Sequence, residues 1–237
     1  MPDYTDATVT IATFNERENL PLVLPLIGEQ APGLNVIVID DDSPDGTGPW
    51  ADEFARDHPW LTVIHRPRKS GYASAHIQGM REAMERGAQR LLTMDADLSH
   101  DPAVLPAILE GLLTHDMVVG SRYVPGGGTR NWGLFRRLLS RFGSFYARTI
   151  LALKQRDCTT GYRGYRVDIV QRSGMLDTTT QGYGFLVEVL YRCVQAGARV
   201  LEVPIIFVDR QHGKSKLSKA IMFEAMLLPW RLRFGRR

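Results

Sequence analysis

Short apolar runs alternate with helix-like segments along the first 120 residues of this 237-residue chain. The runs are rich in β-branched residues and predict strands at residues 9–11, 35–39, 61–64, 91–94 and 117–119. Between them, apolar spacing predicts helices, one opened by a capping box at Asn15 and Glu18 and another from about Ser70 to Arg86. This alternation favours an α/β fold, a mostly parallel sheet with helices on both faces. We expect a single domain, because no repeat or low-complexity linker divides the chain.

Charge is distributed unevenly along the chain. Residues 117–156 contain eight basic side chains and no acid, and residues 210–237 contain eight basic side chains and one acid, Glu224. Because the whole chain carries +3, these two stretches leave −12 for the rest. The basic second half suggests a polyanionic partner such as a nucleotide, a lipid phosphate or an anionic membrane, whereas the acidic first half argues against nucleic acid wrapping the protein.

Composition excludes several classes of protein. The apolar runs fall short of the ~20 residues that span a bilayer, and the N-terminus lacks a signal-peptide pattern, so we expect a cytoplasmic protein. Cys158 and Cys193 lack the spacing of zinc ligands and are interpreted as packing residues. Neither a phosphate-binding P-loop motif nor a dinucleotide-binding glycine motif is present.

Carboxylates follow several of the predicted strands. Asp95 and Asp97 directly follow the run at 91–94, and Asp40, Asp41 and Asp42 follow the run at 35–39. Open α/β sheets bind their ligands at this end of their strands. A pair of aspartates one residue apart suits a divalent cation bridged to a nucleotide diphosphate, although a solvated loop also explains it. After the first strand, Phe14 could lie against a nucleobase and Glu16 could accept hydrogen bonds from a ribose. Four basic residues of the second half could neutralise phosphate charge: Arg122, Arg210, Lys214 and Lys216.

The second half is predicted to contain two amphipathic helices, at residues 132–153 and 219–237. In the first, aromatic and aliphatic residues share one broad face and Arg137, Arg141 and Arg148 share another. Two interpretations are open: a helix packed on the core with a solvated basic back, or a helix lying at a membrane interface. Gly126, Gly127 and Gly128 precede it and indicate a flexible loop or a close approach of the backbone to a ligand.

The strand-end motifs resemble those of family 2 inverting glycosyltransferases. They are Thr13-Phe14-Asn15-Glu16, Asp40 to Thr47, Asp95-Ala96-Asp97-Leu98-Ser99-His100 and Gly120-Ser121-Arg122-Tyr123. Within that family, the later motifs are similar to those of polyprenol- and dolichol-phosphate mannose synthases: Gly126-Gly127-Gly128, Thr159 to Arg163, Gly182 to Phe185 and Arg210 to Leu217. In two departures from the family pattern, Ala12 and Phe14 replace Pro and Tyr, and Ser99 stands where many relatives have Gln.

The resemblance implies a Rossmann-like GT-A fold that transfers mannose from GDP-mannose to a polyprenyl or dolichyl-type phosphate with inversion, using Mg²⁺ or Mn²⁺. It implies that residues 1–125 form the nucleotide-sugar-binding half and residues 126–237 the acceptor-binding and membrane-associating half. The implied catalytic residues are Asp97, Arg122 and Arg210, the metal ligands Asp95 and Asp97, and the acceptor-phosphate ligands Arg122, Arg210 and Lys216. The implied nucleotide-sugar contacts are Ala12, Phe14, Glu16, Asp40, Asp41, Lys69, Gly71, Asp95, Ala96, Asp97 and Glu188.

Some alternatives remain open at this stage. The donor can be UDP-glucose in place of GDP-mannose, and Glu188 can be a charge on a helix surface rather than a sugar contact. A third hypothesis is a non-catalytic nucleotide-sugar-binding subunit of a membrane complex. We expect a protein attached peripherally to the inner face of the membrane, with a membrane-spanning partner protein possible and no nucleic-acid partner.

Overall fold

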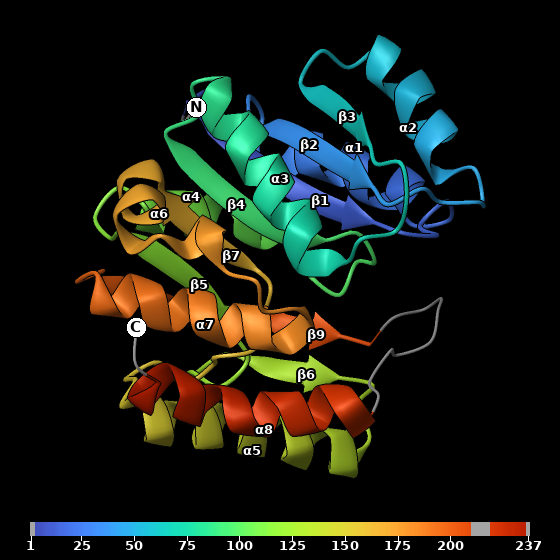
Figure 1. The fold of residues 1–237 in the computed structure, drawn as a ribbon. Coiled ribbons are helices and arrows are strands. Elements are labelled where there is room, and N and C mark those ends of the chain that lie inside the picture. Colours follow the sequence, from blue (N-terminus) through green and yellow to red (C-terminus); the bar gives the residue numbers. More distant parts are fainter. Residues whose placement is uncertain (1–2, 210–218, 236–237) are drawn as a thin grey trace.

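The computed structural model describes residues 3–209 and 219–235 and is centred on a seven-stranded sheet (Figure 1). Its strands are β1 (Ala7–Thr13), β2 (Asn35–Asp40), β3 (Leu61–His65), β4 (Arg90–Asp95), β5 (Met117–Ser121), β7 (Arg163–Arg166) and β8 (Val200–Pro204). They lie in the order β3-β2-β1-β4-β7-β5-β8, and β7 runs antiparallel to β4 and β5 while the other pairs are parallel. The predicted mostly parallel α/β sheet is confirmed.

Helices cover both faces of this sheet, as predicted. They are α1 (Leu20–Gln30), α2 (Thr47–Arg56), α3 (Tyr72–Glu85), α4 (Leu105–Gly111), α6 (Val167–Ser173) and α7 (Gly182–Gln195). One hydrophobic cluster packs α1, α2 and α4 on one face, and a second packs α3, α6 and α7 on the other. In β2, Val36 and Val38 belong to the first cluster while Ile37 and Ile39 belong to the second. A strand buried on both faces explains why its sequence is continuously apolar.

The first helix begins later than the capping box predicted. Helix α1 starts at Leu20, whereas Asn15 adopts a left-handed backbone with φ of 62° outside the helix. The chain makes a turn there, and the side chain of Asn19 donates a hydrogen bond to the Glu16 carboxylate at 2.6 Å. The prediction that Asn15 caps the helix is therefore wrong, because Asn15 turns the chain at the end of β1 instead. The apolar face expected of this helix is confirmed, since Leu20, Val23, Leu24 and Ile27 are buried.

The second half adds a small layer beside the sheet. Strands β6 (Gly128–Arg130) and β9 (Ile206–Val208) pair, and helices α5 (Leu134–Leu151) and α8 (Lys219–Phe234) lie side by side at one end of the molecule (Figure 1). The close approach predicted for the glycine run occurs within the chain, because a Cβ on Gly127 would lie 2.5 Å from the carbonyl oxygen of Ser121. Within the described ranges, no helix combines the length and apolarity needed to cross a membrane.

Candidate active site

The register of the sheet brings the predicted strand-end residues to one edge. Ala12 in β1 is paired with Asp95 in β4, and Thr13 is paired with Asp40 in β2. Arg122 follows the last residue of β5, which runs in the same direction as β4 because both are antiparallel to β7. The carboxylates and this arginine thus share the carboxyl edge of the sheet, the expected place for a ligand.

The turn after β4 holds Asp95 and Asp97 in a constrained geometry. Leu98 has a φ of 57°, a left-handed conformation that a leucine adopts at a cost of about 1–3 kcal/mol. The backbone N–H of Ser99 donates to Asp97 at 3.1 Å, and the backbone N–H of Asp95 donates to Nδ1 of His100 at 3.0 Å. His100 is buried and stacked on Tyr162 with ring centroids 4.8 Å apart, and burial lowers its imidazole pKa.

These residues fit a hard divalent cation. Asp95 and Asp97 supply carboxylate oxygens, and the buried Ser99 hydroxyl, two residues further on, has no hydrogen-bond partner among the described residues. Oxygen donors of this kind suit Mg²⁺ or Mn²⁺. No group of three or more His, Cys, Asp or Glu side chains gathers for a metal within residues 3–209 and 219–235. A cation at this pair would therefore complete its shell with phosphate oxygens and water.

Asp41 anchors the loop that carries two predicted donor-binding residues. Its carboxylate accepts hydrogen bonds from the backbone N–H groups of Ser70 at 3.2 Å and Gly71 at 2.8 Å, and it pairs with Arg66 at 2.6 Å. Beside this loop, the Lys69 ammonium lies 3.4 Å from the centroid of the Phe14 ring. The structure therefore brings Phe14, Asp41, Lys69 and Gly71 to one side of the carboxyl edge. Arg66 was missed, because a lone arginine after a short strand carries no sequence signal.

Asp40 is buried and fixes the turn between β2 and α2. Its carboxylate accepts hydrogen bonds from the hydroxyl of Thr13 at 3.0 Å and from the hydroxyl of Ser43 at 2.5 Å. The backbone N–H of Glu16, the predicted ribose contact, donates to Thr47 at 3.0 Å. These bonds tie the end of β1 to the turn that follows β2.

Arg122 is held in a buried ion pair with Asp157. Two guanidinium nitrogens of Arg122 each lie 2.7 Å from a different oxygen of Asp157, and the Asp157 side chain is 0% exposed. A third hydrogen bond reaches Thr159 at 2.8 Å, and the guanidinium lies 5.6 Å from each of the ring centroids of Trp132 and Phe207. The sequence interpretation did not select Asp157, the buried partner of Arg122.

A hollow of about 330 Å³ opens beside Arg122. Arg137 and Arg141 from α5 line it, together with Tyr123 and the backbone at Gly127 and Gly128. Leu134 and Leu138 line the same hollow and are 67% and 57% exposed. Spacing of four residues places each pair on one side of the helix, a signal that the sequence contained. Arg137 and Arg141 were interpreted only as a basic helix face, and the structure directs them toward this hollow.

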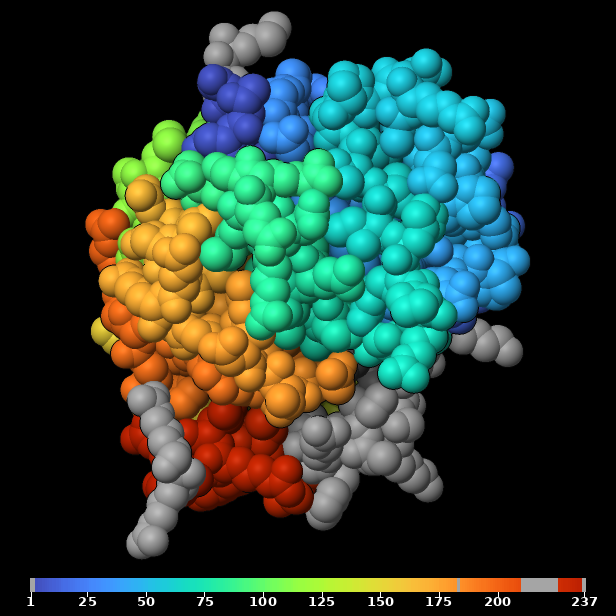
Figure 2. All heavy atoms as spheres, turned by 45° about the horizontal axis from the view of Figure 1, so that its top comes forward, coloured from blue at the N-terminus to red at the C-terminus, as the bar shows by residue number. Residues whose placement is uncertain are grey.

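The apolar side chains of α5 and α8 are exposed rather than packed on the core. The following large apolar residues are each at least 37% exposed: Leu134, Phe135, Leu138, Leu139, Phe142, Phe145, Met226, Leu227, Trp230 and Phe234. The buried side of α5 consists of Ser144, Ala147 and Leu151. The interpretation of α5 as a core-packed helix with a solvated basic back is therefore wrong. Figure 2 shows α8 in red at the edge of the molecule, next to α7.

Glu188 is not a charge on a helix surface. It is buried in α7, where its carboxylate pairs with Arg192 at 2.7 Å and accepts a short hydrogen bond from the Thr180 hydroxyl. Burial alone would raise its pKa, but hydrogen bonds from Thr180, Thr178 and Arg192 hold it below the ordinary value. A sugar contact of Glu188 stays a prediction. Arg210, Lys214 and Lys216, predicted to contact phosphate, lie outside the described residues.

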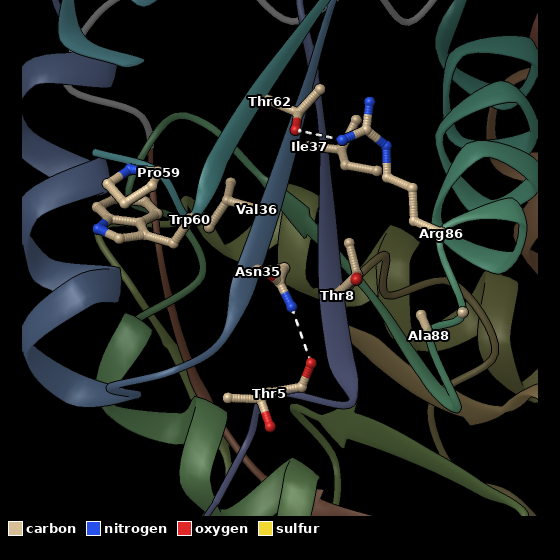
Figure 3. Close-up of a pocket in the computed structure, with 11 residues that line it drawn as sticks. Thr5, Thr8, Asn35, Val36, Ile37, Pro59, Trp60, Thr62, Arg86 and Ala88 are labelled. Carbon is tan, nitrogen blue, oxygen red and sulfur yellow. Dashed lines mark hydrogen bonds between the residues drawn. The ribbon is translucent and has the colours of Figure 1, made fainter. Parts of the chain in front are cut away.

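A second hollow, of about 250 Å³, lies at the opposite end of the sheet (Figure 3). Thr8 and Asn35 at the amino ends of β1 and β2 line it, with Trp60 and an Arg86 guanidinium that donates to Thr62 at 3.1 Å. None of the predicted site residues lines this hollow.

The sheet order and the carboxylate edge give the chain a fold of the GT-A type. A solved glucosyl-3-phosphoglycerate synthase from Mycobacterium tuberculosis, in complex with Mn²⁺, uridine diphosphate and glucosyl-3-phosphoglycerate, matches with a TM-score of 0.69 and 17% identity over 98% of this chain and 81% of that chain. At the sequence level, residues 8–174 match the model of the family described as glycosyl transferase family 2. The chain belongs to glycosyl transferase family 2.

Two curated relatives share at least 40% sequence identity with the chain. The chain is 46% identical to the undecaprenyl-phosphate mannosyltransferase of Micrococcus luteus over 92% of this chain and 89% of that protein. It is 40% identical to the polyprenol monophosphomannose synthase of Mycolicibacterium smegmatis over 92% of this chain and 83% of that protein. The resemblance inferred from the sequence motifs is confirmed.

Proposed function

We propose that the protein transfers mannose from GDP-mannose to a polyprenyl phosphate with inversion at the anomeric carbon, giving a β-mannosyl phosphate lipid and GDP. The observation that carries this proposal is the hollow beside the carboxyl edge, where Arg122, Arg137 and Arg141 meet Leu134 and Leu138. Such a lining suits a phosphate attached to an apolar chain. The relatives named as an undecaprenyl-phosphate mannosyltransferase and a polyprenol monophosphomannose synthase support the same assignment here.

The proposed chemistry depends on positioning and charge. A phosphate acceptor is already anionic near neutral pH, so no side chain has to remove a proton from it. Asp95 and Asp97 would hold Mg²⁺ or Mn²⁺, which when bound offsets negative charge on the departing diphosphate. Arg137 and Arg141 would draw the acceptor phosphate toward the sugar, and the Asp157 pair would fix Arg122 beside it.

The acceptor also suggests where the protein works. We propose that α5 and α8 lie on the inner face of the membrane, with their exposed apolar side chains in contact with lipid. Arg137 and Arg141 flank this face and would interact favourably with anionic head groups. The acceptor phosphate would then enter the hollow from the leaflet.

The test is transfer of radiolabelled mannose from GDP-mannose to polyprenyl phosphate by purified protein with Mg²⁺ or Mn²⁺. We expect labelled lipid that disappears with EDTA and with Asp97→Ala, while unlabelled UDP-glucose does not compete. Asp168→Ala, which removes an exposed carboxylate on α6, is the matched control and should retain transfer. Full turnover by a folded Asp97→Ala variant would refute the metal assignment, and competition by UDP-glucose would favour a glucosyl donor.

A further inference from the structure

Tyr72 connects the start of α3 to the carboxyl end of β4. It is the first residue of α3 and follows Gly71, whose backbone N–H is held by Asp41. Its ring packs edge to face on His76, with centroids 4.5 Å apart, and on Phe185 at 6.4 Å. The Tyr72 hydroxyl and Oδ1 of Asp95 both border the position that a Cβ on Gly161 would occupy, so the hydroxyl lies beside this carboxylate. The two ring contacts therefore fix the direction in which this phenol points.

Gly161 provides the space that the hydroxyl occupies. A Cβ at position 161 would collide with the hydroxyl oxygen of Tyr72 and would lie 3.6 Å from Oδ1 of Asp95. The backbone around this glycine is itself fixed, because its carbonyl accepts a hydrogen bond from Thr93 of β4 at 2.6 Å. The glycine, the hydroxyl and the carboxylate thus form one packed contact at the carboxyl end of β4.

A phenol differs from an arginine as a partner for a carboxylate. The Arg122 guanidinium neutralises Asp157, whereas a phenol donates a hydrogen bond without adding positive charge. A carboxylate oriented in this way keeps its charge for a cation, and outer partners of this kind orient metal ligands in proteins.

From this geometry we infer that Tyr72 is a positioning residue for Asp95 as a metal ligand, and that Gly161 is required because it admits the Tyr72 hydroxyl. The inference rests on the proposed function, in which Asp95 and Asp97 hold a divalent cation.

The first test compares Mn²⁺ binding by wild type and Tyr72→Phe, measured from the electron paramagnetic resonance signal of free Mn²⁺ with GDP present. The substitution keeps the ring contacts with His76 and Phe185 and removes the hydroxyl. We expect the Mn²⁺ dissociation constant to rise about 10-fold, the lower end of the range for outer partners of metal ligands. The affinity for GDP in EDTA should not change. Tyr146→Phe, which removes a hydroxyl bonded to Met226 on α8, is the control and should bind Mn²⁺ as wild type does.

The second test uses Gly161→Ala in two backgrounds. With Tyr72 present, the added methyl displaces the hydroxyl, so Mn²⁺ binding should weaken about as much as in Tyr72→Phe. In the Tyr72→Phe background the nearest ring carbon lies 3.5 Å from the new Cβ, an ordinary contact, so the alanine should cause little further loss. This non-additivity distinguishes a shared contact from general damage to the fold.

The outcomes separate this inference from the function on which it rests. If Tyr72→Phe binds Mn²⁺ as tightly as wild type, or if the two substitutions weaken binding additively, the positioning role is overturned while the metal site stands. If wild type itself binds no Mn²⁺ in the presence of GDP, both the metal assignment and the role of Tyr72 fail.

Discussion

At the scale of single residues, the ion pair of Asp157 and Arg122 links the stability of the fold to the active site. Asp157 also accepts the backbone N–H of Arg122 at 3.1 Å, and Glu202 accepts the backbone N–H of Asp157 at 3.0 Å. Burial by itself would raise the pKa of Asp157, but the charge of Arg122 and the hydrogen bonds from it lower the pKa below its ordinary value. The ionised carboxylate therefore stabilises the folded chain.

This lowered pKa predicts a dependence of stability on pH. A carboxyl group in an unfolded chain titrates near pH 4. The stabilisation by Asp157 is fully present above that value and is lost as the pH falls toward the lower pKa of the folded state. We expect the free energy of unfolding, from urea titrations, to decrease as the pH falls from about 5 to 3.

Asp157→Asn should lower the free energy of unfolding by about 3–5 kcal/mol at pH 7, because it leaves the buried Arg122 without its carboxylate partner. The free energy of unfolding of this variant should depend less on pH between about pH 5 and 3 than that of wild type. Asp168→Asn, which alters an exposed pair, should change the free energy of unfolding by less than about 1 kcal/mol. A variant at position 157 as stable as wild type at pH 7 would contradict this explanation.

At the scale of elements, the end of α5 carries a strained residue. Ala152 follows the last turn in a left-handed conformation with φ of 54° and is exposed. This conformation costs alanine about 1–2 kcal/mol, whereas glycine adopts it at little cost because it has no Cβ. Ala152→Gly is therefore expected to raise the free energy of unfolding by about 1 kcal/mol, measured by urea titration. Lys154→Gly, two residues further on and outside this cap, serves as the control and should give no gain.

Elements with strong periodicity could be predicted, and short polar ones could not. The predicted strand at 91–94 and the helix at 132–153 differ from β4 and α5 by one or two residues at each end. By contrast, β7 reads Arg-Gly-Tyr-Arg, and neither its polar residues nor its antiparallel direction has a signal in the sequence. Strand β7 lies between β4 and β5 and pairs with both, contacts that link distant parts of the sequence.

The candidate site was also predictable only in part. Residues at strand ends were predictable, because the direction of parallel strands decides where their ends meet, as Ala12 and Asp95 illustrate. The partners of those residues were not predictable, because Asp157 reaches Arg122 from 35 positions away and Tyr72 reaches Asp95 from another element. Such contacts depend on tertiary packing, which periodicity does not encode.

At the scale of the whole molecule, the exposed apolar face of α5 and α8 predicts reversible binding to vesicles. The double variant Phe135→Ser and Phe142→Ser removes two aromatic rings that are 79% and 61% exposed. We expect its partition coefficient into anionic vesicles, measured by sedimentation, to fall at least about 10-fold, since each buried ring contributes roughly 1.5–3 kcal/mol.

The control for this experiment lies on another helix. Leu22→Ser and Leu26→Ser on α1 remove two leucines that are 50% and 37% exposed, and this variant should bind vesicles as wild type does. Salt should weaken the binding of every variant by screening the arginines. Equal loss of binding in both double variants would refute a specific membrane face.

An enzyme seated on lipid through α5 and α8 would receive its two substrates in spaces of different dimension. The nucleotide sugar would arrive from water, whereas the acceptor would reach the arginine-lined hollow by lateral diffusion within one leaflet. The velocity of bound enzyme should then follow the mole fraction of acceptor in the bilayer. Diluting a vesicle suspension with buffer would leave that velocity unchanged, while adding phospholipid to a fixed amount of acceptor would slow it.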